Sequence, residues 1–225
     1  AAFCIKDIEP GVVIGDYTGK IITHKEADRK KMLMGMVRND KEVIWANHKD
    51  IGLHIVNHSC TPNCAFYPYK GHIIAVSIRK IFAGEELSVS YFIDQTPHGE
   101  TDIVFSCFCE SEYCKGSMYV PKKISDKYEK FIKKQQGRDL KKKIVDYGKE
   151  LPLLKNYPNN FKDHEIFDLF GASTKKSFVL KDKKLPSIDK IRKTIRETGR
   201  ELSFPDLGVV IAGVTGRSLV IRQGK

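Results

Sequence analysis

Residues 57–60, Asn-His-Ser-Cys, place an amide, an imidazole, a hydroxyl and a thiol at four successive positions. A mainly apolar run, residues 51–56, leads into this stretch, and Thr61-Pro62-Asn63 predicts a turn after it. Such a dense set of donors, acceptors and a soft ligand can bind a small molecule and a metal ion at one place. Residues 54–64 are therefore the candidate centre of a functional site.

The cysteines suggest which metal this site takes. There are six of them: Cys4, Cys60, Cys64, Cys107, Cys109 and Cys114. The last three fall within eight positions, and without an export signal such a cluster favours metal ligation over disulfides. Zinc takes four tetrahedral thiolates, so a fourth ligand must come from elsewhere. Cys60 and Cys64 are both candidates, whereas Cys4 lies in an apolar strand and fits a small buried thiol.

The first 120 residues have the pattern of a β-rich domain. Residues 3–23 predict a strand, a turn and a second strand, because short β-branched runs alternate with Pro and Gly. Residues 24–39 are rich in Lys, Glu, Ala and Met and predict a short helix. Residues 72–79 and 87–92 predict strands, with a turn at 82–86 between them.

The sequence pattern changes from β-rich to helix-rich near Val120. Residues 122–149 predict two basic helices, and Pro152, Pro158 and Asn159-Asn160 predict a linker after them. Further helices are expected at about 161–171, 187–198 and 205–222. Segments beginning at His164 and Phe204 faintly resemble helix-turn-helix units. The fold class is therefore α+β, with small sheets first and a mainly α-helical region after them.

Charge follows the same division. The net charge is +11, but residues 1–120 hold 13 Lys and Arg against 15 Asp and Glu, while residues 121–225 hold 26 against 13. This asymmetry suggests a polyanion partner for the second half, and a solvated Lys-rich surface is the alternative. No apolar run approaches the roughly 20 residues needed to span a bilayer, so we expect an intracellular protein with no membrane partner.

The motifs occur in an order typical of one enzyme family. They are Ile8-Glu-Pro-Gly with Asp16-Tyr-Thr-Gly, then Asn57-His-Ser-Cys-Thr-Pro-Asn-Cys, then Ala83-Gly-Glu-Glu-Leu-Ser-Val-Ser-Tyr91, then Cys-x-Cys-x4-Cys. Each alone is weak evidence. Together they make residues 1–120 resemble SET-domain lysine methyltransferases, whose small sheets surround a knot-like crossing, and the last motif resembles the post-SET zinc loop of that family.

This resemblance implies a cofactor and a metal site. In the family, the Asn-His pair holds S-adenosylmethionine, which assigns Asn57 and His58 to the cofactor. The residue between the first two post-SET cysteines covers the adenine, which assigns Phe108. The cysteine after the serine completes the structural zinc site, which selects Cys60 over Cys64 as the partner of Cys107, Cys109 and Cys114.

The resemblance also implies the catalytic residues. Tyr91 corresponds to the catalytic tyrosine and Tyr17 to a tyrosine that lines the lysine channel. Methyl transfer needs alignment and a neutral amine, whereas free lysine, with a pKa near 10.4, is mostly protonated at neutral pH. A narrow aromatic channel would desolvate the ammonium and lower its pKa, and the Tyr91 hydroxyl could orient the amine and accept weak C–H···O contacts from the methyl group.

Three positions depart from the family pattern. The family carries a Gly-x-Gly segment before the strand that begins at Phe3, and here that segment lies upstream of Ala1 or is absent. Val89 stands where a Phe or Tyr often influences how many methyl groups are added, so the degree of methylation is open. His54 stands where Arg is expected.

Together these features predict a SET domain at 1–105, a post-SET zinc loop at 106–120 and a basic helical region at 121–225. The expected function is transfer of methyl groups to a lysine of a histone or another basic chromatin protein, in the nucleus or on chromatin. Residues 121–225 would then contact DNA or the nucleosome. The alternative is a catalytically weak SET scaffold that serves as a chromatin- or DNA-binding module.

Overall fold

The structure is a computed structural model of the chain, and it describes residues 1–30, 35–47, 52–94, 105–139, 149–158, 187, 189–190, 193, 201–204 and 209–212. Its elements up to the polar stretch are β1 (Val13–Asp16), β2 (Lys20–Thr23), α1 (His24–Asp28), β3 (Gly35–Val37), β4 (Glu42–Trp45), the 3-10 helix η1 (Leu53–Ile55) and β5 (Asn57–His58). Those that follow are β6 (Cys64–Tyr69), β7 (His72–Ser77), β8 (Ser88–Val89), β9 (Ile93–Asp94), β10 (Tyr119–Val120), α2 (Lys122–Asp139), β11 (Glu201–Phe204) and β12 (Val209–Ala212). No helix among these described residues is long and apolar enough to cross a membrane.

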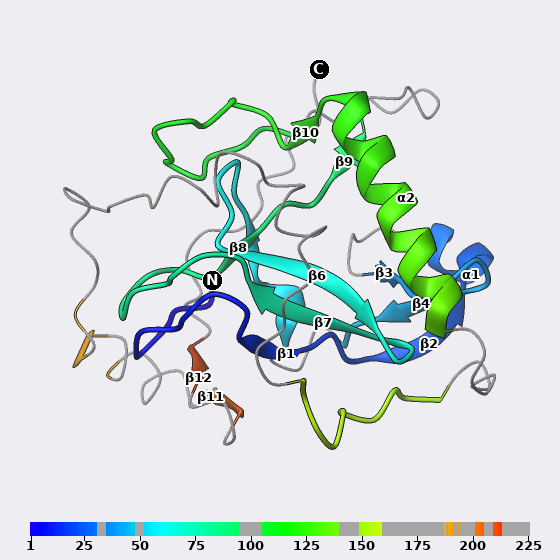
Figure 1. The fold of residues 1–225 in the computed structure, drawn as a ribbon, viewed down its shortest axis with the longest axis horizontal. Helices are drawn as coiled ribbons and strands as arrows, with labels where there is room; N and C mark the ends of the chain where they lie inside the picture. The colour runs from blue at the N-terminus through cyan, green and yellow to red at the C-terminus, as the bar shows by residue number, and fades with distance from the viewer. Residues whose placement is uncertain are drawn as a thin grey trace.

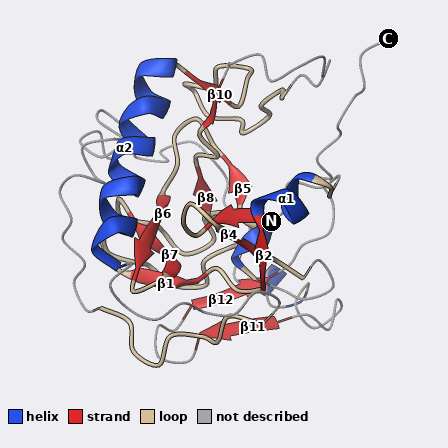
Figure 2. Ribbon diagram, turned by 90° about the vertical axis from the view of Figure 1, so that its right-hand side faces the viewer, coloured by secondary structure: helices blue, strands red, loops and turns tan. Residues whose placement is uncertain are grey.

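Small sheets make up the body of the molecule, which confirms the β-rich part of the predicted fold. The central sheet has the antiparallel order β1-β7-β6, and a second antiparallel sheet has the order β2-β4-β3. Two short pairs, β5 with β8 and β9 with β10, are parallel and join segments far apart in the sequence. In Figures 1 and 2, β6 and β7 run through the middle and α2 lies along one side of them.

The central hairpin is defined by a two-residue turn. β6 and β7 pair from Cys64 opposite Ser77 to Tyr69 opposite His72. The connecting residues, Lys70 and Gly71, both have positive φ angles, 50° and 78°. Two positive φ angles are characteristic of a type I′ turn, whose twist matches that of the flanking strands. This turn therefore fixes the register of the two longest strands.

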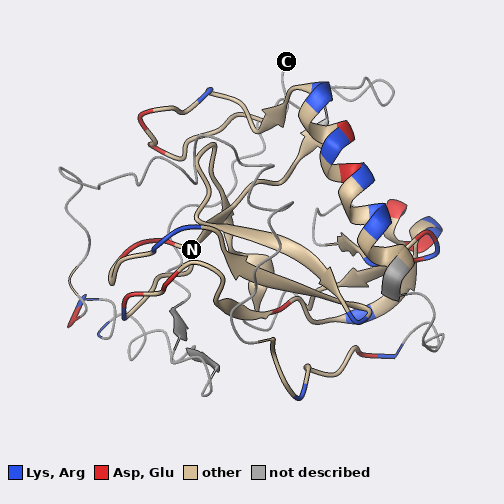
Figure 3. Ribbon diagram, in the orientation of Figure 1, with Lys and Arg blue, Asp and Glu red and all other residues tan. Residues whose placement is uncertain are grey.

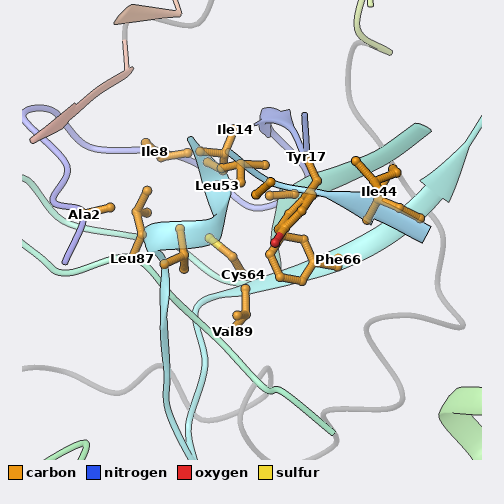
Figure 4. Packing of buried hydrophobic residues seen from close by; sticks show 14 of the residues in the cluster. Ala2, Ile8, Ile14, Tyr17, Ile44, Leu53, Cys64, Phe66, Leu87 and Val89 are labelled. Atoms are coloured by element: carbon orange, nitrogen blue, oxygen red, sulfur yellow. The ribbon is translucent and has the colours of Figure 1, made fainter. Parts of the chain in front are cut away.

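Two clusters of buried side chains fill the space between these elements. The larger cluster lies around the polar stretch, and Figure 4 shows several of its members, including Tyr17, Leu53, Cys64, Phe66 and Val89. The smaller cluster lies between the central sheet and α2 and contains Val13, Ala65, Tyr67, Ile74, Val76, Ile78 and Phe131. The first cluster supports the candidate site directly, whereas the second attaches the C-terminal segment to the sheet.

Helix α2 packs on β6 through one apolar face. Phe131 is buried, and its ring lies 5.5 Å from that of Tyr67 on β6. Tyr128 and Ile132 pack against the same cluster. These positions follow helical spacing, so the remaining face of α2 is left for polar residues. The amphipathic pattern of 122–139 thus determines both the helix and its docked face.

Residues 149–158 are also bound to the domain, although their prolines predict a linker. Leu151 is buried in the larger cluster, and its N–H donates to the Gly19 carbonyl at 2.9 Å. The buried carboxylate of Asp16 accepts from the Tyr157 hydroxyl at 2.6 Å and from the Leu154 N–H at 3.1 Å. A buried carboxylate needs such donors, so Asp16 anchors this segment to β1.

Two predicted elements in the first half are shorter than expected. Among the described residues of the helix expected at 24–39, only α1 is helical, and Gly35–Val37 instead pairs with β4 as strand β3. The strand expected at 87–92 is limited to β8, and β9 begins only after Phe92, which adopts a left-handed backbone with φ of 51°. In both places a tertiary contact overrides the local propensity.

The C-terminal half differs more from its prediction. α2 confirms the first basic helix, but residues 149 and 150 are not helical and Glu150 forms a bridge with Lys20. The prediction of a helix at 205–222 is wrong for its described residues, because Val209–Ala212 form β12, which pairs antiparallel with β11. The Val and Ile residues of this segment favour a strand. The helix-turn-helix reading of the segment at Phe204 loses its basis with it. Residues 189–190 and 193 are helical as expected, and residues 161–171 lie outside the described residues.

Candidate functional site

The polar stretch lies beside the segment that ends at Tyr91. β5 pairs in parallel with β8, so that Asn57 lies opposite Ser88 and His58 opposite Val89. Past the end of this pair, the Ser59 N–H donates to the Val89 carbonyl at 2.9 Å. Two motifs about thirty residues apart in sequence therefore form one site.

Asn63 joins these two segments from the buried side. It is 0% exposed, and its Oδ1 accepts from the Ser88 N–H at 2.8 Å. Its Nδ2 donates to the Glu86 carbonyl at 2.8 Å and to Glu85 Oε1 at 3.1 Å. Glu85 in turn pairs with Arg79. The sequence around Asn63 predicts only a turn, because it carries no local signal for these distant partners.

Replacing this amide tests its role. In Asn63→Asp both Nδ2 donors are lost, and a second carboxylate is placed beside Glu85 in a buried position. We expect the free energy of unfolding to fall by about 2–4 kcal/mol, measured by urea denaturation. Asn39→Asp is a matched control, because Asn39 Nδ2 also donates to a glutamate, Glu42, but from a partly exposed position. A loss no larger than in this control would contradict the role of Asn63.

His58 connects Tyr91 to the cysteine loop. Its Nδ1 accepts from the Tyr91 N–H at 3.1 Å, so the ring proton lies on Nε2, which faces Cys60 Sγ at 3.8 Å. Burial, with the nearby Lys115 cation, lowers the pKa of His58 to about 4. At neutral pH the ring is therefore neutral, accepting on one side and donating on the other.

Asn57 has a defined amide orientation. Its side chain lies 2.8 Å from Glu86 Oε1, and a carboxylate only accepts, so the NH2 group faces Glu86. Its Oδ1 then faces away from Glu86 and can accept from a cationic ligand. Glu86, which sequence reasoning did not single out, is thus the residue that orients Asn57. The motif Gly-Glu-Glu that contains it was recognised, but not this function.

Both candidate tyrosines belong to the surroundings of the larger cluster: Tyr17 is one of its buried members and Tyr91 packs against it. Tyr91 is partly buried, and its hydroxyl donates to the Val56 carbonyl at 3.0 Å. Burial raises the pKa of Tyr91 to about 12. Tyr17 is 4% exposed and packs edge-on against Phe66, and burial, followed by the neighbouring Tyr91, raises its pKa above the usual range. Both hydroxyls are therefore protonated at neutral pH.

Four cysteine sulfurs converge next to His58. The Sγ atoms of Cys60, Cys107, Cys109 and Cys114 all lie within 4.8 Å of one another. Backbone N–H groups point at these sulfurs, among them Cys60 N–H toward Cys109 and Lys115 N–H toward Cys60, each at 3.5 Å. Burial acts to raise the pKa of Cys109, but hydrogen bonds from the N–H groups of Cys60 and Ser111 and from the thiols of Cys107 and Cys114 together outweigh it, and the pKa falls to about 7.

The remaining predicted residues are placed as follows. Cys64 is 1% exposed and lies in the larger core cluster with Cys4, away from the four sulfurs. Phe108 is 76% exposed on the cysteine loop, so its ring is accessible to a ligand and forms no part of the core. Val89 is buried at the crossing, and the His54 ring lies 6.5 Å from that of Tyr17.

Comparison with known proteins agrees with this geometry. Residues 1–92 match the family model described as the SET domain. Residues 1–92 form a SET domain. The crossing of β5 with β8 lies within this matched part, whereas the cysteine loop and α2 follow it.

Curated relatives extend the match. The chain is 30% identical over 126 residues to the histone-lysine N-methyltransferase trithorax of Drosophila virilis, covering 50% of this chain and 3% of that protein. It is 29% identical over 125 residues to the human histone-lysine N-methyltransferase 2B, covering 50% of this chain and 4% of that protein. It is 30% identical over 139 residues to the histone-lysine N-methyltransferase Su(var)3-9 of Drosophila pseudoobscura pseudoobscura, covering 50% of this chain and 22% of that protein. The chain thus spans less than a quarter of the length of these relatives.

Proposed function

We propose that this protein is an S-adenosylmethionine-dependent protein-lysine N-methyltransferase with one structural zinc ion. The observation that carries the proposal is the convergence on one crossing of Asn57, His58 and Tyr91 with the four-sulfur cluster. The names of the relatives support a histone lysine as the substrate and chromatin as the location.

The four sulfurs fit zinc. Tetrahedral zinc with bonds of about 2.3 Å requires sulfurs about 3.8 Å apart, and the Cys60 and Cys107 sulfurs are 3.6 Å apart. The N–H groups of Cys60 and Lys115 that point at sulfur stabilise thiolates, the form that binds metal. A zinc ion here would hold the 107–114 loop against residues 57–60 and would take no part in chemistry.

The residues around Tyr91 suit methyl transfer to an amine. Bound S-adenosylmethionine supplies an activated methyl group on a sulfonium cation. The Asn57 Oδ1 is free to accept from a cationic group such as the cofactor's ammonium, because Glu86 takes the amide NH2. Phe108 is exposed on its loop, and in this proposal its ring would cover the cofactor's adenine.

Tyr91 and Tyr17 provide the environment for the lysine. Both are largely withdrawn from water, so a lysine between them would be desolvated and its ammonium would lose its proton more readily. The Tyr91 hydroxyl proton is committed to the Val56 carbonyl, so the oxygen lone pairs are left to accept from the amine or the methyl group. Tyr91 therefore orients the nucleophile, and its high pKa argues against a role as general base.

Labelled methyl transfer tests the proposal. The full-length protein is incubated with radiolabelled S-adenosylmethionine and with histone octamers, nucleosomes or cell extract. We expect label on a lysine side chain of a basic protein. No label on any substrate, together with no calorimetric heat of cofactor binding, would contradict the enzyme and favour the scaffold.

Helix α2 supports a second function, contact with nucleic acid. Lys123, Lys127, Lys130 and Lys134 are exposed and lie in one row, because their spacing of i, i+4, i+7 and i+11 follows the helix. No acidic residue belongs to this row. The neighbouring row is mixed, with Lys122 paired to Asp126 and Lys133 to Glu129. Figure 3 shows that basic positions recur along α2, with a few acidic positions between them.

The two rows provide a matched test. Changing the four lysines of the first row to Gln should lower the affinity for duplex DNA and reduce the slope of log K against log salt by about 3. Changing Lys122 and Lys133, which have carboxylate partners, should reduce it by less than about 1. Equal effects per lysine in the two sets would show that α2 contributes only general charge. Fluorescence anisotropy at several salt concentrations measures both.

A further inference from the structure

The residue after Tyr91 is clamped by a helix that lies outside the matched SET domain. The Phe92 ring stacks on that of Tyr128 in α2, with ring centroids 3.7 Å apart and planes 4° from parallel. This is face-to-face contact over nearly the whole ring. Aromatic pairs usually prefer offset or edge-on arrangements, so this close stack requires that both rings be held in place by their surroundings.

Phe92 also has an unusual backbone. Its φ is 51°, in the left-handed region that costs a non-glycine residue about 1–2 kcal/mol. Such a conformation persists only where the surroundings impose it. Directly after it, Ile93 pairs with Tyr119 in the short parallel pair β9–β10, which ends just before α2. Residues 92–94 are therefore held by residues 119–128 on their C-terminal side.

Tyr128 itself sits on a firmly docked part of α2. One turn further along the helix, Phe131 packs on Tyr67 of the central sheet. Tyr128 is partly buried against the smaller cluster, and this burial raises the pKa of its hydroxyl above the usual range. The position of Tyr128 is thus determined by α2 and β6, independently of Phe92.

The consequence concerns Tyr91. The N–H of Tyr91 is fixed by His58 and its hydroxyl by Val56, both from the polar stretch. The direction in which the chain leaves Tyr91 is set by the φ angle of Phe92. If the stack were lost, Phe92 could relax to a negative φ, which would rotate the peptide between the two residues and shift the Tyr91 ring.

We propose that Tyr128 is a positioning residue: its stack on Phe92 holds the left-handed backbone that aims the Tyr91 hydroxyl. The catalytic side of this inference rests on the proposed methyltransferase function. α2 follows residues 1–92, which match the SET domain model, so the clamp links the matched part to a segment beyond it.

Three variants test the clamp. Tyr128→Leu removes the ring, Tyr128→Phe keeps it, and Ile132→Ala is a matched control that weakens α2 docking in the same cluster without touching the Phe92 stack. We expect Tyr128→Leu to lower kcat about 10- to 100-fold, since small misplacements at a reaction centre have effects of this size. The KM for the cofactor should change little. Tyr128→Phe should restore kcat to within about 2-fold of the original protein.

Hydrogen exchange of the Tyr91 amide gives a readout that does not depend on catalysis. Tyr128→Leu should lower its protection, and Ile132→Ala should not. If the two variants lose the same kcat and protection, α2 merely stabilises the fold and the proposal fails. If Tyr128→Leu does not fold, Phe92→Leu removes the other ring and must show the same kcat and exchange changes. A response of the Tyr91 amide in a protein that transfers no methyl group would overturn the proposed function but leave the clamp intact.

Discussion

Tyr91→Phe is expected to reduce methyl transfer by about 10²- to 10³-fold, the range seen when one oriented group at a reaction centre is removed. In the proposed function the hydroxyl is the group that would face the substrate, and only the ring would remain to desolvate the amine. Loss of the bond to the Val56 carbonyl should lower the free energy of unfolding by only about 1 kcal/mol. Single-turnover transfer from labelled S-adenosylmethionine measures the first effect and thermal unfolding the second.

Two controls show whether Tyr91→Phe affects the methyl-transfer step or the structure of the protein: its cofactor affinity, and the activity of a variant at a second tyrosine. Calorimetry should give nearly the same affinity for S-adenosylmethionine in Tyr91→Phe and in the original protein. Tyr69→Phe, at the far end of β6, should leave transfer unchanged. Because the pKa of Tyr91 is raised to about 12, the rate should rise with pH as the substrate lysine loses its proton, with no break from Tyr91 below about pH 11. Full activity in Tyr91→Phe would eliminate the role assigned to this hydroxyl.

Loss of the metal is expected to have the largest effect on the site as a whole. Cys109→Ser removes one of four converging sulfurs, and the purified protein should then hold much less than one zinc ion per chain. The cysteine loop adjoins His58 through Cys60, so loosening the loop should also disturb the residues assigned to the cofactor. We expect the affinity for S-adenosylmethionine to fall at least about 10-fold, together with a lower melting temperature.

Cys64 provides the control for this prediction. It lies only four residues from Cys60 but is buried in the core, so Cys64→Ala should keep one zinc ion and normal cofactor affinity despite some loss of stability. Zinc release, measured with a colorimetric chelator, distinguishes the two variants. Cofactor binding that survives complete removal of zinc would contradict the coupling between the metal and His58.

The sequence alone determined the kind of site that this protein has. The polar stretch at 57–60, the Gly-Glu-Glu motif before Tyr91 and the closely spaced cysteines are local patterns, and local patterns can be read without a structure. The strand at 72–79, the first basic helix and the β-rich character of the first half were predicted for the same reason, since each depends on the periodicity of neighbouring residues.

Tertiary structure decided which of these residues meet and what else holds them. Asn63 and Glu86 orient the crossing through partners more than twenty positions away, and no local pattern encodes such distant pairs. Asp16 binds residues 154 and 157, so a segment that resembles a linker belongs to the domain. Phe92 is left-handed although its sequence favours a strand, because long-range packing onto Tyr128 outweighs a local preference of about 1–2 kcal/mol.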